Sequence, residues 1–268
     1  MIWLIQSGFN DGGYLSLIES LERLSIEYYL VDVIPFGGGY KLPDGLTTKD
    51  IIVYGSSSFI QFAKDQCWTP GSYINDNFAV DVWAKHYKEE LLNSDSMYGT
   101  ISNIEIPYEH FFIRPVYDNK KFSGMLMHRD EFESWRSKIL DIPDEEYSTI
   151  KGNTEICIST IKQIIVEYRL FVVDGKVVTG SEYKRGDCVA YYEFIPEYIL
   201  EYAKTVIDMW VPDNAFCLDI AEILIDDKPY CKVLEINCIN GCGLYMADTD
   251  KYVYALTNQG KDNDKDYL

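Results

Sequence analysis

Apolar and polar residues follow two different periods along the first 90 or so residues. Runs rich in branched and aromatic side chains at residues 1–6, 27–36 and 50–56 predict strands, because such side chains suit a pleated, buried surface. Residues 14–25 instead carry leucine or isoleucine at three-residue steps, which predicts an amphipathic helix. Strands that alternate with a helix indicate a small α/β domain, which we assign to residues 1–92.

Beyond residue 96 the pattern changes to longer strand-like runs joined by turns, with helical stretches around 130–140 and 196–210. We expect one larger α+β domain over residues 93–258 and a polar tail, 259–268, that frays. The glycine run Gly37 to Gly39 is followed by neither a Lys-Ser/Thr pair nor a helix. It is therefore predicted to be a flexible connection and not a phosphate-binding loop.

The segment "VEYRLFVVDGKVVTGSEYK" predicts a β-hairpin, since Asp174-Gly175 stands between two β-rich runs. A two-residue turn there pairs Val173 with Lys176, Phe171 with Val178, Arg169 with Gly180 and Glu167 with Glu182.

This register places four charged side chains on one face of the hairpin and an apolar set on the other. A solvated face with weak salt bridges explains four charges as well as a binding site does. The charged face holds Glu167, Arg169, Glu182 and Lys184, and the apolar face holds Tyr168, Leu170, Val172, Val177 and Tyr183.

A second hairpin is predicted in "AFCLDIAEILIDDKPYCKVLEIN", with its turn within residues 226–229. Strand alternation brings Asp219 opposite Glu235 or Asn237 on one side of the sheet. Carboxylates that close repel unless a cation lies between them, and oxygen ligands favour Mg²⁺ or Mn²⁺. The alternative is that Asp219 is a bulge or turn residue and Glu235 an isolated carboxylate with a shifted pKa.

A third segment, "FFIRPVYDNKKFSGMLM", joins two predicted strands through a polar loop. Pro115 ends regular pairing because it lacks an N–H, and Gly124 permits a close backbone approach to a ligand. Arg114 offers a planar fork for phosphate oxygens, and Lys120 and Lys121 add charge. Loops with lysines are common on any protein surface, but they are less expected in an acidic chain.

The composition narrows the classes of function. A formal charge of -19, from 24 basic and 43 acidic residues, argues against a broad nucleic-acid-binding face. No basic leader or long apolar stretch opens the chain, so we expect a cytoplasmic protein that binds no membrane. The seven cysteines form no CxxC pair and are expected to be reduced packing residues, although Cys231, Cys238 and Cys242 invite comparison with a zinc site. The three histidines, His86, His110 and His128, show no sequence partner and are expected to be surface or packing residues.

Taken in order, these segments resemble the ATP-grasp superfamily over roughly residues 96–256. The shared pattern is a strand with Arg-Pro, a flexible glycine loop, a hinge strand, the "EYR" hairpin, and Asp followed by Glu-x-Asn. The commoner pattern has lysine where Arg114 stands, and "KFSG" after an arginine is similar to a clade frequent in bacteriophages and bacteria. The resemblance implies two α+β subdomains that clasp ATP, with Mg²⁺ or Mn²⁺.

The resemblance also implies a role for each matching residue. Arg114 would contact the α and β phosphates, and Lys121, Phe122 and Gly124 would belong to the loop over the triphosphate. Residues 155–160, with Ser159 and Thr160, would form the hinge beside adenine. Phosphates or an acyl-phosphate would be met by Arg169 and Lys184, nucleotide by Glu167 and Glu182, metal ions by Asp219, Glu235 and Asn237, and the region of the γ-phosphate by Asn240.

The resulting hypothesis is an ADP-forming ligase that joins a carboxylate to an amine or thiol through an acyl-phosphate, on small-molecule or peptide substrates. It needs no protein nucleophile, which fits the absence of a persuasive Ser-His or Cys-His pair. Two alternatives belong to other classes. One is a non-catalytic protein, possibly phage-encoded, that senses nucleotide or mimics nucleic acid with its acidic surface. The other, a polynucleotide ligase, needs lysine in a Lys-x-Asp-Gly motif, where Val172 stands.

Overall fold

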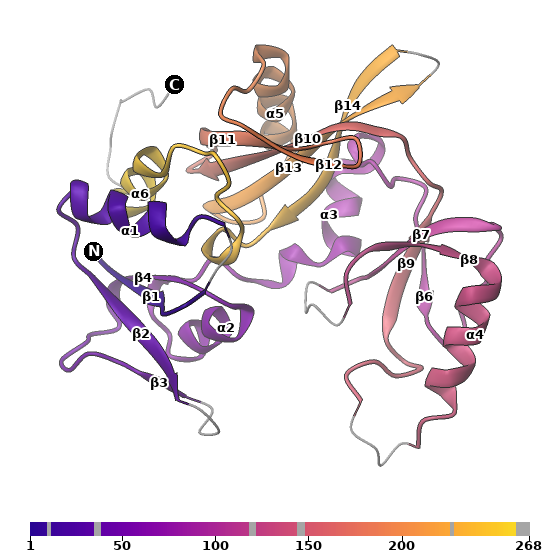
Figure 1. The fold of residues 1–268 in the computed structure, drawn as a ribbon, viewed down its shortest axis with the longest axis horizontal. Helices are drawn as coiled ribbons and strands as arrows, with labels where there is room; N and C mark the ends of the chain where they lie inside the picture. The colour runs from indigo at the N-terminus through magenta and orange to yellow at the C-terminus, as the bar shows by residue number, and fades with distance from the viewer. Residues whose placement is uncertain (10–11, 35–38, 118–121, 144–147, 226–227, 261–268) are drawn as a thin grey trace. The chain divides into compact units, whose positions relative to one another are not determined.

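The protein has a mixed α and β fold with three sheets, as shown by a computed structural model (Figure 1). The predicted α+β class is therefore confirmed. Contacts divide the chain into unit 1, Met1–Asp76 with Ile164–Leu268, and unit 2, Asn77–Gln163. The boundaries after residues 92 and 258 stay predictions, because these units group residues by packing and not by sequence segment. The structure describes residues 1–9, 12–34, 39–117, 122–143, 148–225 and 228–260.

The first sheet of unit 1 has five strands in the order β3-β2-β1-β4-β5, with β1 parallel to both β2 and β4. The three predicted strands and the predicted helix of this region are confirmed as β1, β2, β4 and α1. Gly37 and Gly38 lie outside the described residues, and Gly39 begins β3. The elements are β1 (Ile2–Gln6), α1 (Tyr14–Arg23), β2 (Tyr28–Ile34), β3 (Gly39–Lys41), β4 (Lys49–Tyr54), α2 (Ser57–Asp65) and β5 (Thr69–Gly71).

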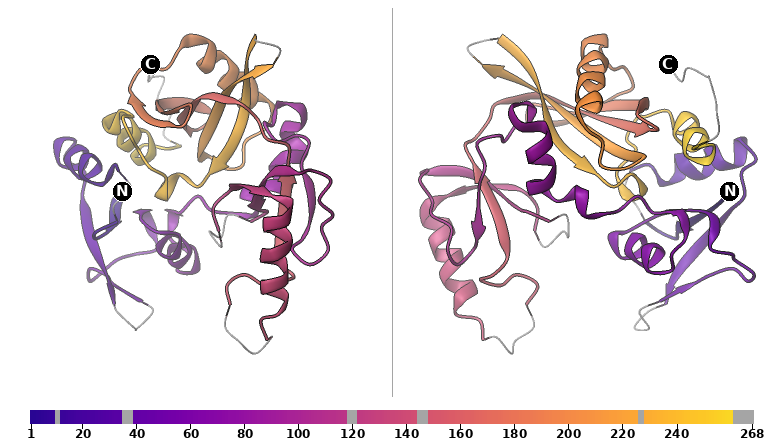
Figure 2. Two further views of the ribbon diagram at one scale, coloured as in Figure 1. Left: turned by 45° about the vertical axis from the view of Figure 1, so that its right-hand side comes forward. Right: turned by 180° about the vertical axis from the view of Figure 1, so that it is seen from behind.

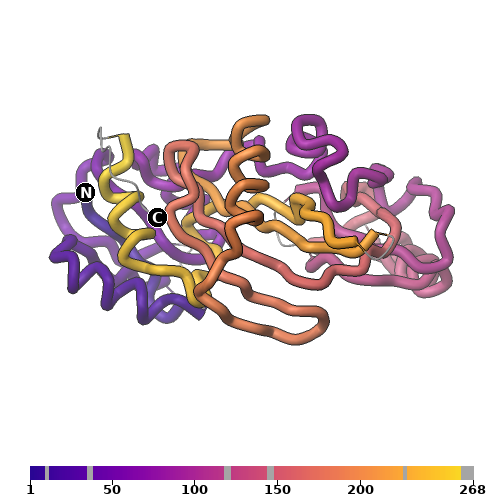
Figure 3. The backbone as a smooth tube through the Cα atoms, turned by 90° about the horizontal axis from the view of Figure 1, so that it is seen from above, coloured from indigo at the N-terminus to yellow at the C-terminus, as the bar shows by residue number. Residues whose placement is uncertain are grey.

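Helices cover this sheet and tie it to the second sheet of unit 1. On one face Trp3 packs in a buried cluster with Leu21 of α1, and the same cluster reaches Phe171 and Tyr252. Tyr252 belongs to α6 (Thr249–Thr257), which lies beside α1 in Figures 1 and 3. On the other face Leu4 packs with Phe59 of α2. One continuous core therefore fixes the N-terminal sheet against the second one.

The second sheet of unit 1 is antiparallel, with the order β12-β11-β10-β13-β14, and it carries most of the predicted site. The helix predicted at 196–210 is confirmed as α5, which contributes buried residues such as Ile199 and Ala203 (Figure 1). The tail from residue 261 lies outside the described residues. The elements are β10 (Ile164–Val173), β11 (Lys176–Arg185), β12 (Cys188–Tyr192), α5 (Glu197–Met209), β13 (Ala215–Ile225), β14 (Lys228–Asn237) and the 3-10 turn η3 (Ile239–Gly241).

The β10–β11 hairpin confirms the predicted turn but corrects the predicted register. Asp174 and Gly175 both have positive φ, 49° and 73°, as a two-residue hairpin turn requires. Two register shifts, at Phe171/Val172 and Glu167/Tyr168, move the later pairs. The observed pairs are Val173 with Lys176, Phe171 with Thr179, Arg169 with Ser181, Tyr168 with Glu182 and Glu167 with Lys184.

Unit 2 is a four-stranded sheet covered by a helix. Its strand order is β6-β9-β7-β8, and the helix predicted at 130–140 is confirmed as α4, seen beside the sheet in Figure 2. Phe132 and Ile139 of α4 pack on Phe111 and Ile113 of β7. Among the described residues, no helix is long and apolar enough to cross a membrane. The elements are η1 (Asp76–Phe78), α3 (Val80–Tyr87), η2 (Lys88–Glu90), β6 (Met97–Thr100), β7 (His110–Pro115), β8 (Met125–His128), α4 (Arg129–Leu140) and β9 (Glu155–Ser159).

Candidate functional site

A row of charged residues crosses three neighbouring strands of the second sheet. Arg169 on β10 lies opposite Asp219 on β13, and Asp219 lies opposite Glu235 on β14. Residues directly opposite in antiparallel strands point to the same face, so the three side chains are neighbours. The predicted pairing of Asp219 with Glu235 is confirmed.

Arg169 and Asp219 form a buried, two-pronged ion pair. Arg169 Nε donates to Asp219 Oδ1 at 2.8 Å and Nη2 donates to Oδ2 at 2.7 Å. Burial raises the pKa of Asp219 to about 6, the Arg169 guanidinium opposes this, and the Glu235 and Glu167 carboxylates add to the rise. The site therefore concentrates negative charge that one arginine only partly balances.

Glu235 and Asn237 continue this face along β14. Asn237 Nδ2 donates to Glu235 Oε1 at 3.0 Å, which leaves the Asn237 amide oxygen as a ligand atom. Each Asp219 oxygen holds more than one acceptor position, so its bonds to Arg169 leave room for a cation. Two carboxylates and an amide oxygen are the hard ligands that Mg²⁺ takes, and this donor set fits that ion.

Glu167 and Lys184 lie on the same face as Arg169, one pair further along the hairpin. Lys184 Nζ donates to Glu167 Oε1 at 2.8 Å, and the Tyr183 hydroxyl donates to Oε2 at 2.7 Å. Both neighbours reach Glu167 because the register shift leaves Tyr183 as the extra residue between Glu182 and Lys184. The assignment of Tyr183 to the apolar face is therefore wrong.

Two tyrosines and a serine join the site, and the sequence analysis missed all three. The Arg169 guanidinium lies 5.4 Å from the Tyr183 ring centroid and 5.2 Å from that of Tyr245, and the two rings stack. Ser181, opposite Arg169, is fully buried, and its hydroxyl has no partner among the described residues. The only sequence signal was the length of the "GSEYK" strand, which does not show where the bulge falls.

Two predicted residues lie away from this face. Glu182 pairs with Tyr168 on the opposite face, where it accepts two hydrogen bonds from Arg185, so its predicted place beside Arg169 is wrong. The Asn240 amide is buried against the N-terminal sheet: its Oδ1 accepts from Tyr73 N at 2.8 Å and its Nδ2 donates to Val53 O at 2.8 Å. The structure gives Asn240 a packing role and does not bring it to the charged row.

In unit 2, Arg114 lies on β7 with its guanidinium 5.7 Å from the Trp83 ring centroid. Two other residues predicted for the phosphate loop are part of the fold of unit 2. Phe122 packs edge-on against Trp135, and a side chain on Gly124 would meet Phe112 Cζ at 2.6 Å. Lys121 lies outside the described residues.

The predicted hinge residues of unit 2 differ from each other. Ser159, at the end of β9, is buried, and its hydroxyl has no partner among the described residues. Such a hydroxyl costs roughly 1–3 kcal/mol unless a ligand or water satisfies it. Thr160 is already engaged, since its backbone N–H donates to Asp95 Oδ2 at 3.0 Å.

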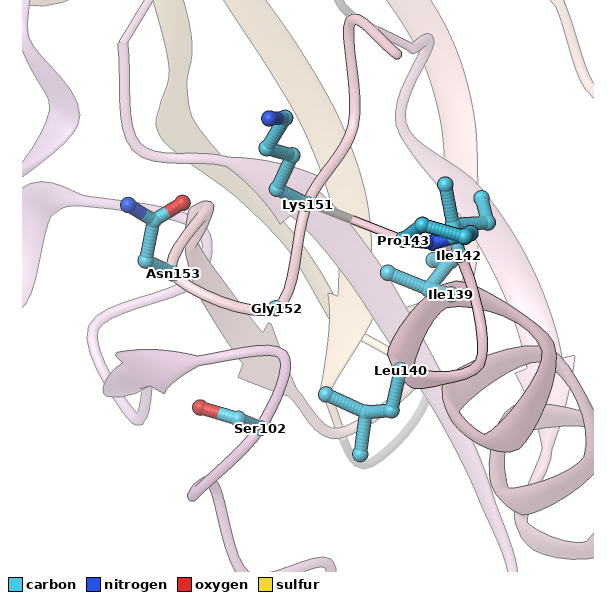
Figure 4. Close-up of a pocket in the computed structure, with 8 residues that line it drawn as sticks. All are labelled: Ser102, Ile139, Leu140, Ile142, Pro143, Lys151, Gly152 and Asn153. Atoms are coloured by element: carbon cyan, nitrogen blue, oxygen red, sulfur yellow. The ribbon is translucent and has the colours of Figure 1, made fainter. Parts of the chain in front are cut away.

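Unit 2 also contains a cavity of about 330 Å³ at the end of α4. Figure 4 shows Leu140 beside Gly152 at its wall, with Lys151 and Asn153 on the following segment. No predicted site residue lines it, so it stands apart from the charged row.

Comparison with known proteins gives a family match and a set of similar folds. Residues 95–255 match the sequence model of an ATP-grasp domain family, the second family of its clade. A search of curated proteins found no match.

Three solved structures illustrate the similarity of fold. D-alanine–D-alanine ligase from Bacillus anthracis is 12% identical with a TM-score of 0.57, covering 96% of this chain and 92% of its own. D-cycloserine synthetase DcsG is 10% identical with a TM-score of 0.57, covering 96% and 99%. A RimK domain protein ATP-grasp from Sphaerobacter thermophilus is 12% identical with a TM-score of 0.58, covering 93% and 92%.

Proposed function

The chain belongs to the ATP-grasp family, and on that premise we propose that it is an ADP-forming ligase. In this proposal it joins a carboxylate to an amine or thiol. The carboxylate oxygen attacks the γ-phosphorus of ATP and ADP leaves, which gives an acyl-phosphate. The amine or thiol then attacks the acyl carbon, phosphate leaves, and the nucleophile loses its proton.

The single observation that carries the proposal is the row Arg169–Asp219–Glu235 across three strands, with Asn237 beside it. Asp219, Glu235 and Asn237 would hold Mg²⁺ or Mn²⁺, which when bound would neutralise phosphate charge. Arg169 would then share Asp219 with the metal and turn part of its fork toward a phosphate oxygen. A purely structural ion pair requires neither Glu235 nor Asn237 on the same face.

The other chain residues supply cations and donors. Lys184 lies against Glu167 with 40% of its side chain exposed, so it can also reach a phosphate or the acyl-phosphate. We propose that Arg114 takes the role of the usual nucleotide-binding lysine, together with Lys121. The buried hydroxyls of Ser159 and Ser181 are candidate hydrogen-bond donors to nucleotide.

The proposed substrates are small molecules or peptides. Solved structures of similar fold include D-alanine–D-alanine ligase and PsnB, an ATP-grasp ligase complexed with a minimal precursor, at 12% identity each. We propose that the reaction takes place in the cytoplasm, where thiols such as those of the seven cysteines stay reduced. Nucleic acid and membranes are not proposed as partners.

The test is an ATP-consumption assay with Mg²⁺ against a panel of amino acids and peptides, read by product mass. The proposal expects ADP, phosphate and a condensed product whose formation requires both acceptor and Mg²⁺. AMP and pyrophosphate would rule out the acyl-phosphate route.

The net charge of -19 keeps a second candidate, the acidic interaction protein. Calorimetry separates the two proposals, since binding of ATP with Mg²⁺ favours the ligase. Absence of binding at millimolar nucleotide favours the mimic.

A further inference from the structure

Two of the three histidines face each other on the β-hairpin of unit 2. His110 on β7 lies directly opposite His128 on β8. Their ring centroids are 4.8 Å apart at an interplanar angle of 71°. The third histidine, His86, is exposed on α3. The sequence analysis found no partner for any of them, because strand register is what pairs these two.

Glu109 completes the cluster, and the fold holds its backbone in place. Its Oε1 lies 3.7 Å from His128 Nε2, and one ligand atom from each of the three residues lies within 4.8 Å of the others. The Glu109 carbonyl accepts from Arg129 N at 2.9 Å. The Arg129 side chain also donates to the carbonyls of Tyr108 and Pro107, each at 3.0 Å.

The other ring nitrogen of His128 has a carboxylate beside it. His128 Nδ1 accepts from Asp130 N at 3.1 Å as the cap of α4, and Asp130 Oδ2 lies 3.9 Å from the same nitrogen. A metal at Nε2 needs the proton on Nδ1, and Asp130 is placed to accept it. A carboxylate behind a metal-bound histidine fixes its tautomer and ring orientation. The lost cap costs about 1 kcal/mol, which is small against a metal–imidazole bond.

We propose that Glu109, His110 and His128 bind a divalent transition metal of the imidazole-preferring class, with Zn²⁺ the first candidate. Tetrahedral ligands at Zn²⁺ distances lie about 3.4 Å apart, so the three ligand atoms must draw together by about 1.4 Å at most. Glu109 and His110 are exposed, which lets their side chains make that movement. Water fills the fourth position.

The metal links the two strands that flank the Arg114 segment. His110 begins β7, and His128 ends β8, so the site lies at the open end of the hairpin and the connection lies at the other end. Binding therefore closes the hairpin whose first strand carries Arg114. This site uses nitrogen ligands and is separate from the oxygen-ligand set of Asp219.

The test is a calorimetric titration of the full chain with Zn²⁺, in saturating Mg²⁺ and a phosphine reductant that keeps thiols reduced. The wild-type protein is expected to bind Zn²⁺ at a site that His110→Gln and His128→Asn weaken. Loss of a carboxylate behind a ligand already costs about 10- to 100-fold in affinity, so loss of an imidazole should cost at least about tenfold. Asn in place of His128 retains a helix cap and keeps folding out of the comparison.

His86→Ala is the matched control, since it removes an exposed histidine of the same unit and should leave Zn²⁺ affinity unchanged. Proton NMR of the three imidazoles adds a direct readout, in which Zn²⁺ shifts the His110 and His128 signals and not that of His86. Absence of Zn²⁺ binding, equal affinity in wild type and His110→Gln, or an equal loss in His86→Ala each overturns the proposal.

Discussion

Two arginine–carboxylate pairs lie on opposite faces of the β10–β14 sheet and have nearly the same geometry. Arg169 binds Asp219 through two hydrogen bonds of 2.8 and 2.7 Å, and Arg185 binds Glu182 through two of 2.8 and 2.6 Å. Their surroundings differ. The Arg169 side chain is 9% exposed and its carboxylate is fully buried, whereas the Arg185 side chain is 55% exposed.

The difference shows that bond geometry alone does not identify a functional pair. Arg185 and Glu182 are three residues apart on one strand, and water solvates the arginine, so the pair adds little stability. Arg169 reaches across to another strand, and Glu235 and Glu167 raise the pKa of its partner in the same direction as burial. A buried pair with surplus carboxylates suits a cation, and the exposed pair does not.

The largest expected effect is on stability, from Asp219→Asn. It leaves the buried Arg169 charge without its carboxylate, which should lower the free energy of unfolding by about 3–5 kcal/mol. The matched change on the other face, Glu182→Gln, should cost at most about 1 kcal/mol because Arg185 stays in contact with water. Urea unfolding of both variants checks this, and equal losses would break the comparison.

The next effect is on catalysis, from Glu235→Gln. It keeps the shape of the side chain but removes a charged metal ligand, so Mg²⁺-dependent ADP formation should fall by about 100-fold or more. Stability should change by no more than about 0.5 kcal/mol. Glu182→Gln is again the control and should retain activity, although the sequence pattern also assigns Glu182 to nucleotide. Wild-type activity in Glu235→Gln would remove the metal assignment.

Asn240→Ala should separate a packing residue from a site residue. The side chain bonds to Tyr73 N and Val53 O, both buried, and its loss leaves two backbone groups without partners. The expected cost is about 2 kcal/mol in the free energy of unfolding, with turnover per folded molecule unchanged. A large fall in turnover at unchanged stability would restore the catalytic role that the family pattern implies.

Much of the fold follows from local pattern, and so does the metal-ligand set. The Asp174-Gly175 turn and the period-two alternation placed Arg169, Asp219 and Glu235 on one face, because turn chemistry and pleat are local properties. The bulge that moves Glu182 to the other face is not local. It adds one residue to β11 without disturbing the composition of the strand, so alternation alone could not locate it.

Long-range packing explains the other differences. Asn240 follows the metal-ligand strand, and only the folded core shows that its amide is bound to residues more than 160 positions away. The His110–His128 pair likewise depends on the register of a hairpin whose connection has no turn signature like Asp174-Gly175. In both cases the side chain is ordinary in the sequence and its partner is set by tertiary structure.

The smallest expected effect is the salt dependence of the two pairs. Replacing Arg185 with glutamine should cost at most about 1 kcal/mol at low salt, and the cost should vanish near 1 M NaCl, where the Debye length is about 3 Å. Arg169→Gln should keep its larger cost at both salt concentrations, because solvent ions do not enter the buried site. Urea unfolding of the two variants at low and high NaCl measures this. If the cost of Arg169→Gln also disappears with salt, the Arg169–Asp219 pair is solvated in solution, and burial no longer distinguishes the two faces.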